Sequence, residues 1–229
     1  IESQLNDKRA YASQQMYANM CKADSFGISR LGEKEQVEAI TAESLTAQYR
    51  TLLETTPIEI FYVGSQTYKT VRSKLRSVLK DLPRGELDFE IGTDIRMNSV
   101  EPEPRYFEDE MAVSQGKLSL GFRLGEIMDD PDYAALYVMN ALYGGSVTSK
   151  LFMNVREKLS LCYSVGSAYY GGKGIIAVAA GIDGENQETT KAEILRQLED
   201  CQKGQITAQE LEAARQTLLS SLRSIHDSP

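Results

Sequence analysis

The sequence contains a single histidine among its 229 residues, and this scarcity excludes several classes of catalytic site. Hydrolases of the Ser-His-Asp and Cys-His types need an imidazole base beside the nucleophile. Zinc motifs of the H-x-x-E-H and H-E-x-x-H kinds need two histidines, and one imidazole with scattered carboxylates suits zinc poorly. The one histidine, His226, follows the last periodic apolar stretch and is interpreted as a solvated tail residue. We therefore expect no catalytic residue and no metal ligand in this chain.

Cysteines are also few, and their arrangement predicts neither a metal site nor a disulfide framework. There are three cysteines, an odd number, and they lie far apart in the sequence: Cys21, Cys162 and Cys201. Free thiols of this kind suit a reducing compartment, so we expect a cytoplasmic protein. Because Cys162 has no histidine partner, it is interpreted as a small buried residue and not as a nucleophile.

Basic residues are in the minority, which bears on the partners that the chain can have. Lysine and arginine total 25 against 33 aspartate and glutamate residues, and no basic stripe offsets the net charge of −8. An acidic surface repels phosphate backbones, so we expect no nucleic-acid partner. No run approaches the roughly 18 apolar residues that a membrane span needs, so no membrane-spanning segment is expected. The opening residues, Ile1-Glu2-Ser3-Gln4, are neither basic nor apolar, so no signal peptide is predicted.

Glycine-rich turns are present, but they lack the spacing of a phosphate-binding loop. Residues 144–150 precede a helix and could offer backbone amides to an anion. A tight turn between two helices explains them better, and residues 171–174 have the composition of a hairpin turn. An enzyme that acts on a small molecule through a nucleotide fold is therefore a distant alternative.

The sequence does contain an alternation of helical and strand-like apolar patterns. Apolar spacing predicts helices from the start of the chain to Met20 and over residues 41–53, 71–82, 130–143, 149–159, 185–202 and 208–225. Runs rich in β-branched and aromatic residues predict strands over residues 58–63, 106–113, 117–124, 161–170 and 175–181. This order predicts an α+β fold of two-layer units, with helices packed on a mostly antiparallel mixed sheet.

Some boundaries are marked by specific residues. The first helix shows no capping residue, whereas Thr41 and the capping box of Thr207 with Glu210 begin later helices. The continuous run of small residues at 175–181 is typical of a strand inside a sheet. Residues 84–105, interrupted by glycines and prolines, are predicted to connect two units.

The stretch from Ala141 to Val165 carries the most specific pattern in the chain. A helix ends in Gly144-Gly145, and Ser149-Lys150-Leu151-Phe152 opens the next helix, which continues to Val155-Arg156-Glu157-Lys158. A strand then carries Leu161-Cys162-Tyr163-Ser164-Val165. In order and spacing this stretch closely resembles the signature of the insulinase/pitrilysin family of zinc metallopeptidases, which includes the mitochondrial processing peptidases.

The resemblance extends over nearly all of the chain. The family has a helix introduced by I-T-x-E-x-L before a strand that ends in V-G, and residues 40–64 follow that order. A closing I-T-x-x-E-L helix matches residues 206–211. The resemblance implies half of a clamshell: residues 1–83 as the tail of a first peptidase-like domain, 84–105 as a linker, and 106–229 as a second α+β domain. It points to the C-terminal region without the zinc site, as in bacterial processing-peptidase-like members and members regarded as inactive.

Two residues of the signature are implied to bind substrate. In the family an Arg-Tyr pair contacts the peptide near the scissile bond, and by motif match these residues are Arg156 and Tyr163, seven positions apart. A phenolic donor can stabilise an oxyanion, and arginine offers a fixed fork of donors to a carbonyl. Without the resemblance, Arg156 reads as part of a solvated charge cluster and Tyr163 as an ordinary strand aromatic.

The chain departs from the family pattern just before the tyrosine. Many relatives have Gly-Leu-Ala there, whereas this sequence has Ser160-Leu161-Cys162. A glycine that relaxes the turn is therefore replaced, which affects the reach of Tyr163.

The sequence thus predicts the non-catalytic, substrate-binding region of a zinc-dependent insulinase-like peptidase that cleaves peptides or unfolded polypeptides. Zinc is expected only in a missing N-terminal domain or in a partner subunit. The expected partners are a peptide substrate and either its own zinc-bearing half or a homologous subunit. The alternative is an inactive subunit or scaffold that complements a zinc-bearing subunit in a heterodimer.

Overall fold

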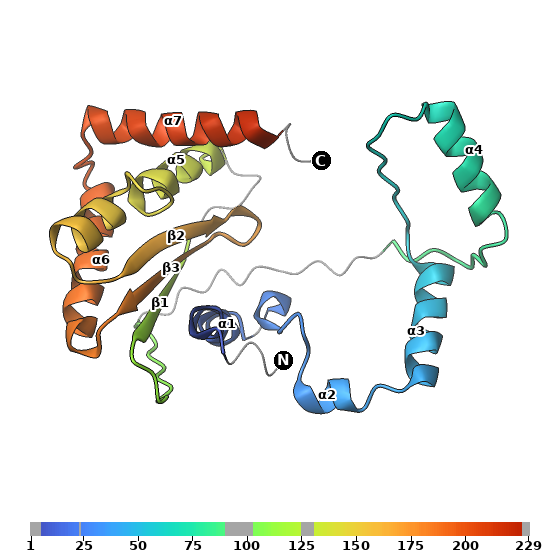
Figure 1. Cartoon of the computed structure of the whole chain (residues 1–229), viewed down its shortest axis with the longest axis horizontal. Helices are drawn as coiled ribbons and strands as arrows, with labels where there is room; N and C mark the ends of the chain where they lie inside the picture. The colour runs from blue at the N-terminus through green and yellow to red at the C-terminus, as the bar shows by residue number, and fades with distance from the viewer. Residues whose placement is uncertain (1–5, 23, 90–102, 125–130, 226–229) are drawn as a thin grey trace. The chain divides into compact units, whose positions relative to one another are not determined.

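The computed structural model describes residues 6–22, 24–89, 103–124 and 131–225. The chain forms two compact units. The sheet unit is formed by Ile1–Arg30 together with Arg96–Ser228, and the helical unit by Leu31–Ile95 (Figure 1). Each unit is described separately. His226 lies outside the described residues, as does most of the predicted connection at 84–105.

The sheet unit is built on three antiparallel strands in the order β1-β3-β2. The strands are β1 (Gly116–Arg123), β2 (Ser164–Tyr170) and β3 (Ile175–Ile182). In the register, Leu120 of β1 lies opposite Val178 of β3, and Val165 of β2 lies opposite Ala180 of β3. The central place of β3 confirms the prediction of an interior strand for the run of small residues.

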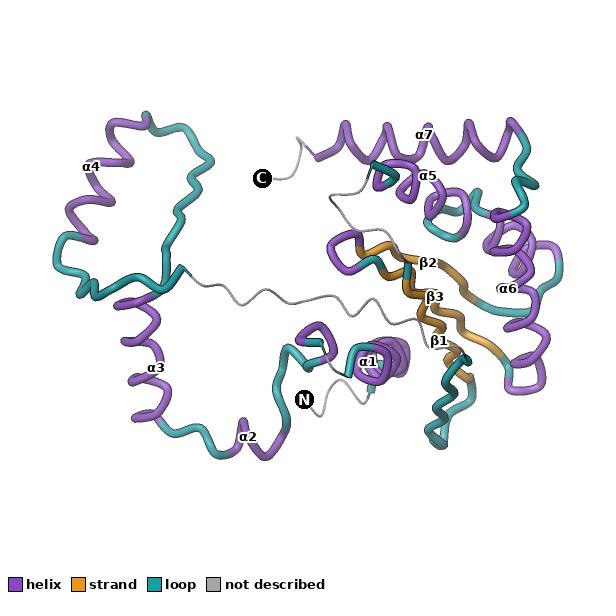
Figure 2. Tube along the Cα trace, turned by 180° about the vertical axis from the view of Figure 1, so that it is seen from behind, coloured by secondary structure: helices purple, strands orange, loops and turns teal. Residues whose placement is uncertain are grey.

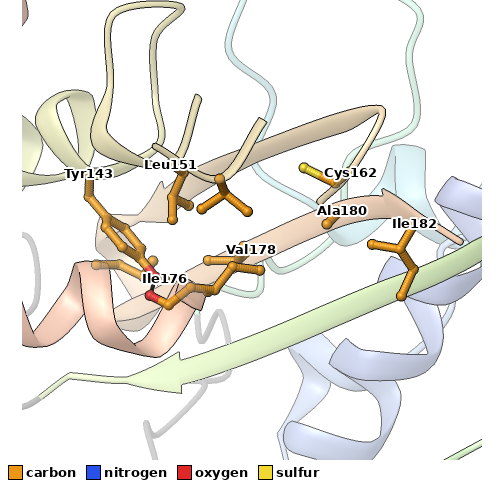
Figure 3. Packing of buried hydrophobic residues seen from close by; sticks show 9 residues of the cluster. Tyr143, Leu151, Cys162, Ile176, Val178, Ala180 and Ile182 are labelled. Atoms are coloured by element: carbon orange, nitrogen blue, oxygen red, sulfur yellow. Dashed lines mark hydrogen bonds between the residues drawn. The ribbon is translucent and has the colours of Figure 1, made fainter. Parts of the chain in front are cut away.

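One face of β3 carries the hydrophobic core. Its alternate residues Ile176, Val178 and Ile182 are at most 2% exposed and pack against the helical layer (Figure 3). That layer consists of α5 (Tyr133–Tyr143), the helix η3 (Leu151–Lys158) and α6 (Gln187–Gln202). Tyr143 of α5 is fully buried, and its hydroxyl donates to the carbonyl of Ile194 in α6 at 3.0 Å. Each buried aliphatic side chain contributes about 1.5–3 kcal/mol, so this layer stabilises the unit.

The opposite face of the sheet is covered by α1 (Lys8–Met20), which packs on β1 (Figure 1). A Cβ added at Gly121 would lie 2.5 Å from the Sδ atoms of both Met16 and Met20, so the helix approaches closely only because that residue is glycine. The expectation that this helix lacks a cap is wrong. The side chain of Asp7 accepts hydrogen bonds from the amides of residues 9 and 10, at 3.1 and 3.0 Å, and aspartate is a preferred N-cap residue.

Further contacts tie the segment after α1 to the sheet. Lys173, which follows β2, forms an ion pair with Asp24 at 3.2 Å, and the Asp24 side chain is fully buried. The guanidinium of Arg123 donates to the carbonyl of Met20 at 3.1 Å. Residues 6–30 therefore pack with the sheet. The physical reason is the small-residue face of β1 and β3, which accepts a helix at short distance.

The last helix, α7 (Ala208–Ser224), packs on α5 and begins with the capping box that the sequence predicted (Figure 1). The amide of Glu210 donates to Thr207 Oγ1 at 3.2 Å, and the amide of Thr207 donates to Glu210 Oε2 at 2.8 Å. The other carboxylate oxygen, Oε1, accepts from Nζ of Lys150 at 2.7 Å, and the Lys150 side chain is only 7% exposed. Burial by itself would raise the pKa of Glu210, but the hydrogen bonds from Lys150 and Thr207 together more than offset it, so the pKa is lowered. One carboxylate thus caps α7 and binds it to the start of η3.

The helical unit contains α2 (Lys34–Glu38), α3 (Ala42–Thr55) and α4 (Tyr68–Leu79). Thr41 caps α3 as predicted, accepting from the amide of Ser44 at 3.1 Å. Arg84, after α4, donates to the carbonyl of Leu53 at 2.5 Å and to that of Thr56 at 2.7 Å. The chain therefore closes a loop that begins and ends at the C-terminus of α3.

Two of the predicted strands are absent from the described residues. Residues 58–63 form an irregular segment between α3 and α4 (Figure 2), with Phe61 at 87% and Val63 at 78% exposure. Residues 106–113 are likewise irregular, and Tyr106 is 73% exposed. Both predictions are wrong for this chain because β-branched and aromatic residues confer only a preference, and a strand forms only beside a backbone partner. The α+β fold itself, with helices packed on an antiparallel sheet, agrees with the prediction.

Replacing Glu210 with alanine is expected to lower the free energy of unfolding by about 2–3 kcal/mol, because it removes both a helix cap and the partner of a largely buried ammonium group. Urea denaturation followed by circular dichroism measures the change. Glu212→Ala is the matched control, since that residue lies on the same helix and pairs with exposed Arg215 at 3.2 Å. It should cost at most about 0.5 kcal/mol. Equal losses in the two variants would contradict the dual role of Glu210.

Candidate functional site

The first element of the candidate site is η3, a helix at the predicted place that has the hydrogen-bond pattern of a π-helix. The amide of Leu159 donates to the carbonyl of Asn154, five residues earlier, at 3.1 Å. Leu151 and Val155 are fully buried and anchor the helix in the core, so their neighbour Arg156 points toward the surface. Single π-turns inside helices are frequent at functional sites.

The turn after η3 has a backbone conformation that a residue with a Cβ rarely adopts. Ser160 has a φ of +52°, and in the described part of the chain it is the one residue other than glycine with a positive φ. Two hydrogen bonds hold the turn: the amide of Ser160 donates to the carbonyl of Arg156, and that of Leu161 donates to the carbonyl of Val155, both at 3.1 Å. The left-handed region costs roughly 1–2 kcal/mol for such a residue. The position where the family pattern has glycine is therefore strained here.

Tyr163 lies at the entrance to β2, where the strand pairing is irregular. Its amide donates to the carbonyl of Gly181 at 2.8 Å, while the register of β2 pairs the next residue, Ser164, with the same Gly181. Two residues thus face one partner, which is the arrangement of a β-bulge. Bulges change the direction of a side chain, and the Tyr163 side chain is exposed to 53%.

The structure brings Arg156 and Tyr163 into direct contact. The Nε atom of Arg156 donates to the backbone carbonyl of Tyr163 at 2.9 Å. Its Nη1 atom donates to Glu157 at 2.5 Å, and its guanidinium lies 4.7 Å from the ring centre of Phe152. Nη2 has no hydrogen-bond partner among the described residues, and the side chain is 38% exposed. Arg156 therefore keeps donors for a ligand.

A third residue, Asp183, completes the site and was not found from the sequence. The hydroxyl of Tyr163 donates to the Asp183 carboxylate, with 2.9 Å to Oδ1 and 2.8 Å to Oδ2. Asp183 follows directly after β3. A hairpin pairing of the two predicted strands around residues 171–174 would have placed residue 183 near residue 163. The sequence therefore held a signal for Asp183, but only once strand pairing is assumed.

The hydrogen bond to Asp183 determines what the phenol offers to a ligand. This bond, followed by burial, raises the pKa of Tyr163, since a phenolate beside a carboxylate would bring two negative charges together. The phenolic proton is directed to Asp183, so a substrate oxygen would have to compete for it. The surface therefore presents cationic donors at Arg156, an acceptor at the phenolic oxygen, and an anionic acceptor at Asp183.

The remaining candidates for chemistry do not join this site. Cys162 is 8% exposed, and burial raises the pKa of its thiol although Arg156 opposes the shift. This agrees with the interpretation of a small buried residue. Within residues 6–22, 24–89, 103–124 and 131–225, no three His, Cys, Asp or Glu side chains gather where they could hold a metal ion. The described residues therefore do not fit zinc. In the same ranges, no helix is both long enough and apolar enough to cross a membrane.

The matching family model and the matching relatives point to the same family. The family model described as the Peptidase M16 inactive domain matches residues 39–218. A "Probable inactive metalloprotease YmfF" of Bacillus subtilis (strain 168) is 32% identical over 212 residues, which are 92% of this chain and 49% of that protein. An "Uncharacterized zinc protease YmxG" of the same organism is 26% identical over 202 residues, which are 86% of this chain and 47% of that protein. The chain therefore spans about half the length of these relatives.

Solved structures share the architecture. A conserved protein from Enterococcus faecalis V583 superposes with a TM-score of 0.85 at 28% identity, over 98% of this chain and 52% of that chain. A peptidase M16 inactive domain from Pseudomonas fluorescens superposes with a TM-score of 0.76 at 24% identity, over 97% of this chain and 53% of that chain. The second likeness shows the fold alone, and both confirm the predicted α+β fold class.

Replacing Ser160 with glycine is expected to raise the free energy of unfolding by about 1 kcal/mol, because glycine adopts a positive φ without the steric penalty of a Cβ. Thermal or urea unfolding measures the gain. Ser164→Gly is the matched control, since Ser164 lies in β2, where glycine should cost about 0.5–1 kcal/mol. A loss of stability in the Ser160 variant would show that the turn carries no strain.

Proposed function

Because this chain belongs to the peptidase M16 family, through its match to the inactive domain, we propose that it is the non-catalytic, substrate-binding region of a zinc-dependent peptidase that cleaves peptides or unfolded polypeptides. The resemblance to the insulinase/pitrilysin family is thereby confirmed. The observation that carries the proposal is the direct contact of Arg156 and Tyr163 on an exposed surface.

The chemistry of this pair suits the backbone of an extended peptide. The Nη2 group of Arg156 can donate to a peptide carbonyl, while Nε and Nη1 keep the guanidinium in place. A hydrogen bond to a charged group contributes about 1.5–3 kcal/mol. The phenolic oxygen of Tyr163 can accept from a peptide amide, and its exposed ring adds apolar contact area. A peptide that uses both residues would be held at two points without dependence on its sequence.

The helical unit supports a division of the longer protein into domains. In that division residues 1–83 end a first α+β domain, 84–105 form a linker, and 106–229 form a second domain, with the helix α1 of the first packed on the sheet of the second. The described part of the helical unit leaves several large apolar side chains exposed, among them Ile58, Phe61 and Val63. Exposed apolar surface of this kind marks an interface. We propose that sequence outside these 229 residues covers it and pairs with the strand-prone segment 58–63.

Zinc, in this proposal, is bound outside the chain. The described residues do not fit a zinc site, and the sequence holds one histidine. The metal and the residues that activate water would come from another part of a longer protein or from a partner subunit. The chain's own part is to bind and orient the peptide opposite that site.

A second candidate function is an inactive subunit or scaffold that complements a zinc-bearing subunit. The observation in its favour is the name of a relative that is 32% identical, the "Probable inactive metalloprotease" of Bacillus subtilis. In this case the longer protein would lack zinc altogether, and Arg156 and Tyr163 would serve a neighbouring subunit.

Arg156→Ala is expected to weaken the binding of a fluorescein-labelled extended peptide about tenfold or more, because it removes charged donors. Tyr163→Phe should weaken binding several-fold, since it removes the phenolic oxygen but keeps the ring. Fluorescence anisotropy measures both, and unfolding curves establish that the variants are folded. Arg215→Ala is the matched control, because Arg215 is also exposed and paired with a neighbouring glutamate. Unchanged binding by Arg156→Ala would favour the scaffold function.

Metal analysis of the full-length protein, purified without added metal, separates the two candidate functions. A zinc site in another part of the longer protein predicts about one zinc ion per chain, as expected for a catalytic site with three protein ligands and one open position. An inactive subunit or scaffold that complements a zinc-bearing subunit predicts no zinc in the full-length protein. The peptidase function would be contradicted if the full-length protein contained zinc but did not cleave a peptide that the 229-residue region binds.

A further inference from the structure

The Asp183 residue is exposed, and its carboxylate bonds to a phenol and not to a cationic side chain. The Tyr163 hydroxyl bonds to both of its oxygens, and no lysine or arginine among the described residues pairs with it. A carboxylate can accept about four hydrogen bonds, so one phenol leaves most of its acceptor capacity unused. Asp183 is therefore an anionic acceptor on an open surface, beside the residues proposed to hold the peptide.

The position of this carboxylate is fixed from two sides. Asp183 follows Ile182, which is 2% exposed and belongs to the buried central strand β3. Its backbone carbonyl accepts from the amide of Asn186 at 2.9 Å, which closes the turn after the strand. The phenol of Tyr163 then orients the side chain. A pre-oriented acceptor loses little conformational entropy when it binds a donor.

Arg156 does not bond to Asp183. Arg156 donates to the backbone carbonyl of Tyr163 and to the side chain of Glu157. Tyr163 therefore lies between the two charges: Arg156 bonds to its backbone, and Asp183 bonds to its hydroxyl. A positive donor group and a negative acceptor group are thus presented at the two ends of one tyrosine.

We propose that Asp183 is an anionic subsite that makes this surface prefer peptides with a lysine or arginine side chain next to the backbone held by Arg156. This inference rests on the proposed function, since it names the class of peptide that the same site selects. The carboxylate would accept from the ammonium or guanidinium group, and Tyr163 would keep it in place as a positioning residue. Charge-assisted hydrogen bonds are the stronger kind, so a basic side chain gains more here than a neutral amide.

The test uses the whole 229-residue chain and two fluorescein-labelled extended peptides of equal length. They are identical except that one carries lysines where the other carries glutamines. Anisotropy titrations at about 0.1 M salt screen distant charges and leave direct contacts. We expect the chain to bind the lysine peptide about fivefold more tightly than the glutamine peptide.

Asp183→Asn should reduce that preference to less than about twofold, because asparagine keeps an acceptor for Tyr163 and loses only the charge. Tyr163→Phe should reduce the preference partly, since it frees the carboxylate. Glu108→Gln is the matched control: Glu108 is an exposed acidic residue of the same unit. This variant should keep the fivefold preference.

The outcomes separate this inference from the proposed function. The subsite would be overturned if Asp183→Asn kept the full preference for the lysine peptide, or if Glu108→Gln lost as much of it as Asp183→Asn. In either case the overall negative charge would explain the preference. Equal binding of both peptides by the unaltered chain would also overturn it and leave the proposed function standing. Failure to bind either peptide would refute the proposed function and the subsite together.

Discussion

The burial of alternate side chains of β3 against the helical layer is the constraint on which the rest of the sheet unit depends. β3 pairs with a strand on each side, so its register sets the positions of both neighbours. One face carries the isoleucines and valine of the core (Figure 3), and the other allows α1 to approach at Gly121 of β1 (Figure 1). A slip of one residue would exchange these two faces and expose the core.

The candidate site inherits its geometry from this core. Val155 is fully buried, so the next residue of η3, Arg156, is held at the surface at a defined point. The backbone amide of Tyr163 donates a hydrogen bond to the carbonyl of Gly181 in β3, which fixes the residue, and Asp183 follows directly after that strand. Supporting a binding site from rigid elements is what keeps its groups within bonding geometry. The strained turn at Ser160 connects the two supports and sets how the chain passes from one to the other.

The helical unit shows the opposite situation. Its helices α3 and α4 begin at threonine caps, and Arg84 bonds to the end of α3, yet large apolar side chains such as Phe61 remain exposed. Local signals are sufficient to form a capped helix, because its hydrogen bonds lie within one segment. They are insufficient for a strand, whose hydrogen bonds require a second segment. The contrast between the two units agrees with a chain that spans about half the length of its relatives.

The sequence by itself determined the family, the fold class, the caps at Thr41 and Thr207 and the central strand. Each of these depends on residues close together in the chain or on a motif of fixed spacing. Only the tertiary structure decided that Asp183 receives the phenol, that η3 is a π-helix, that Ser160 lies at positive φ, and that residues 58–63 and 106–113 form no strand. These features depend on which distant segments meet and how the core constrains the backbone, and local preference does not specify such contacts.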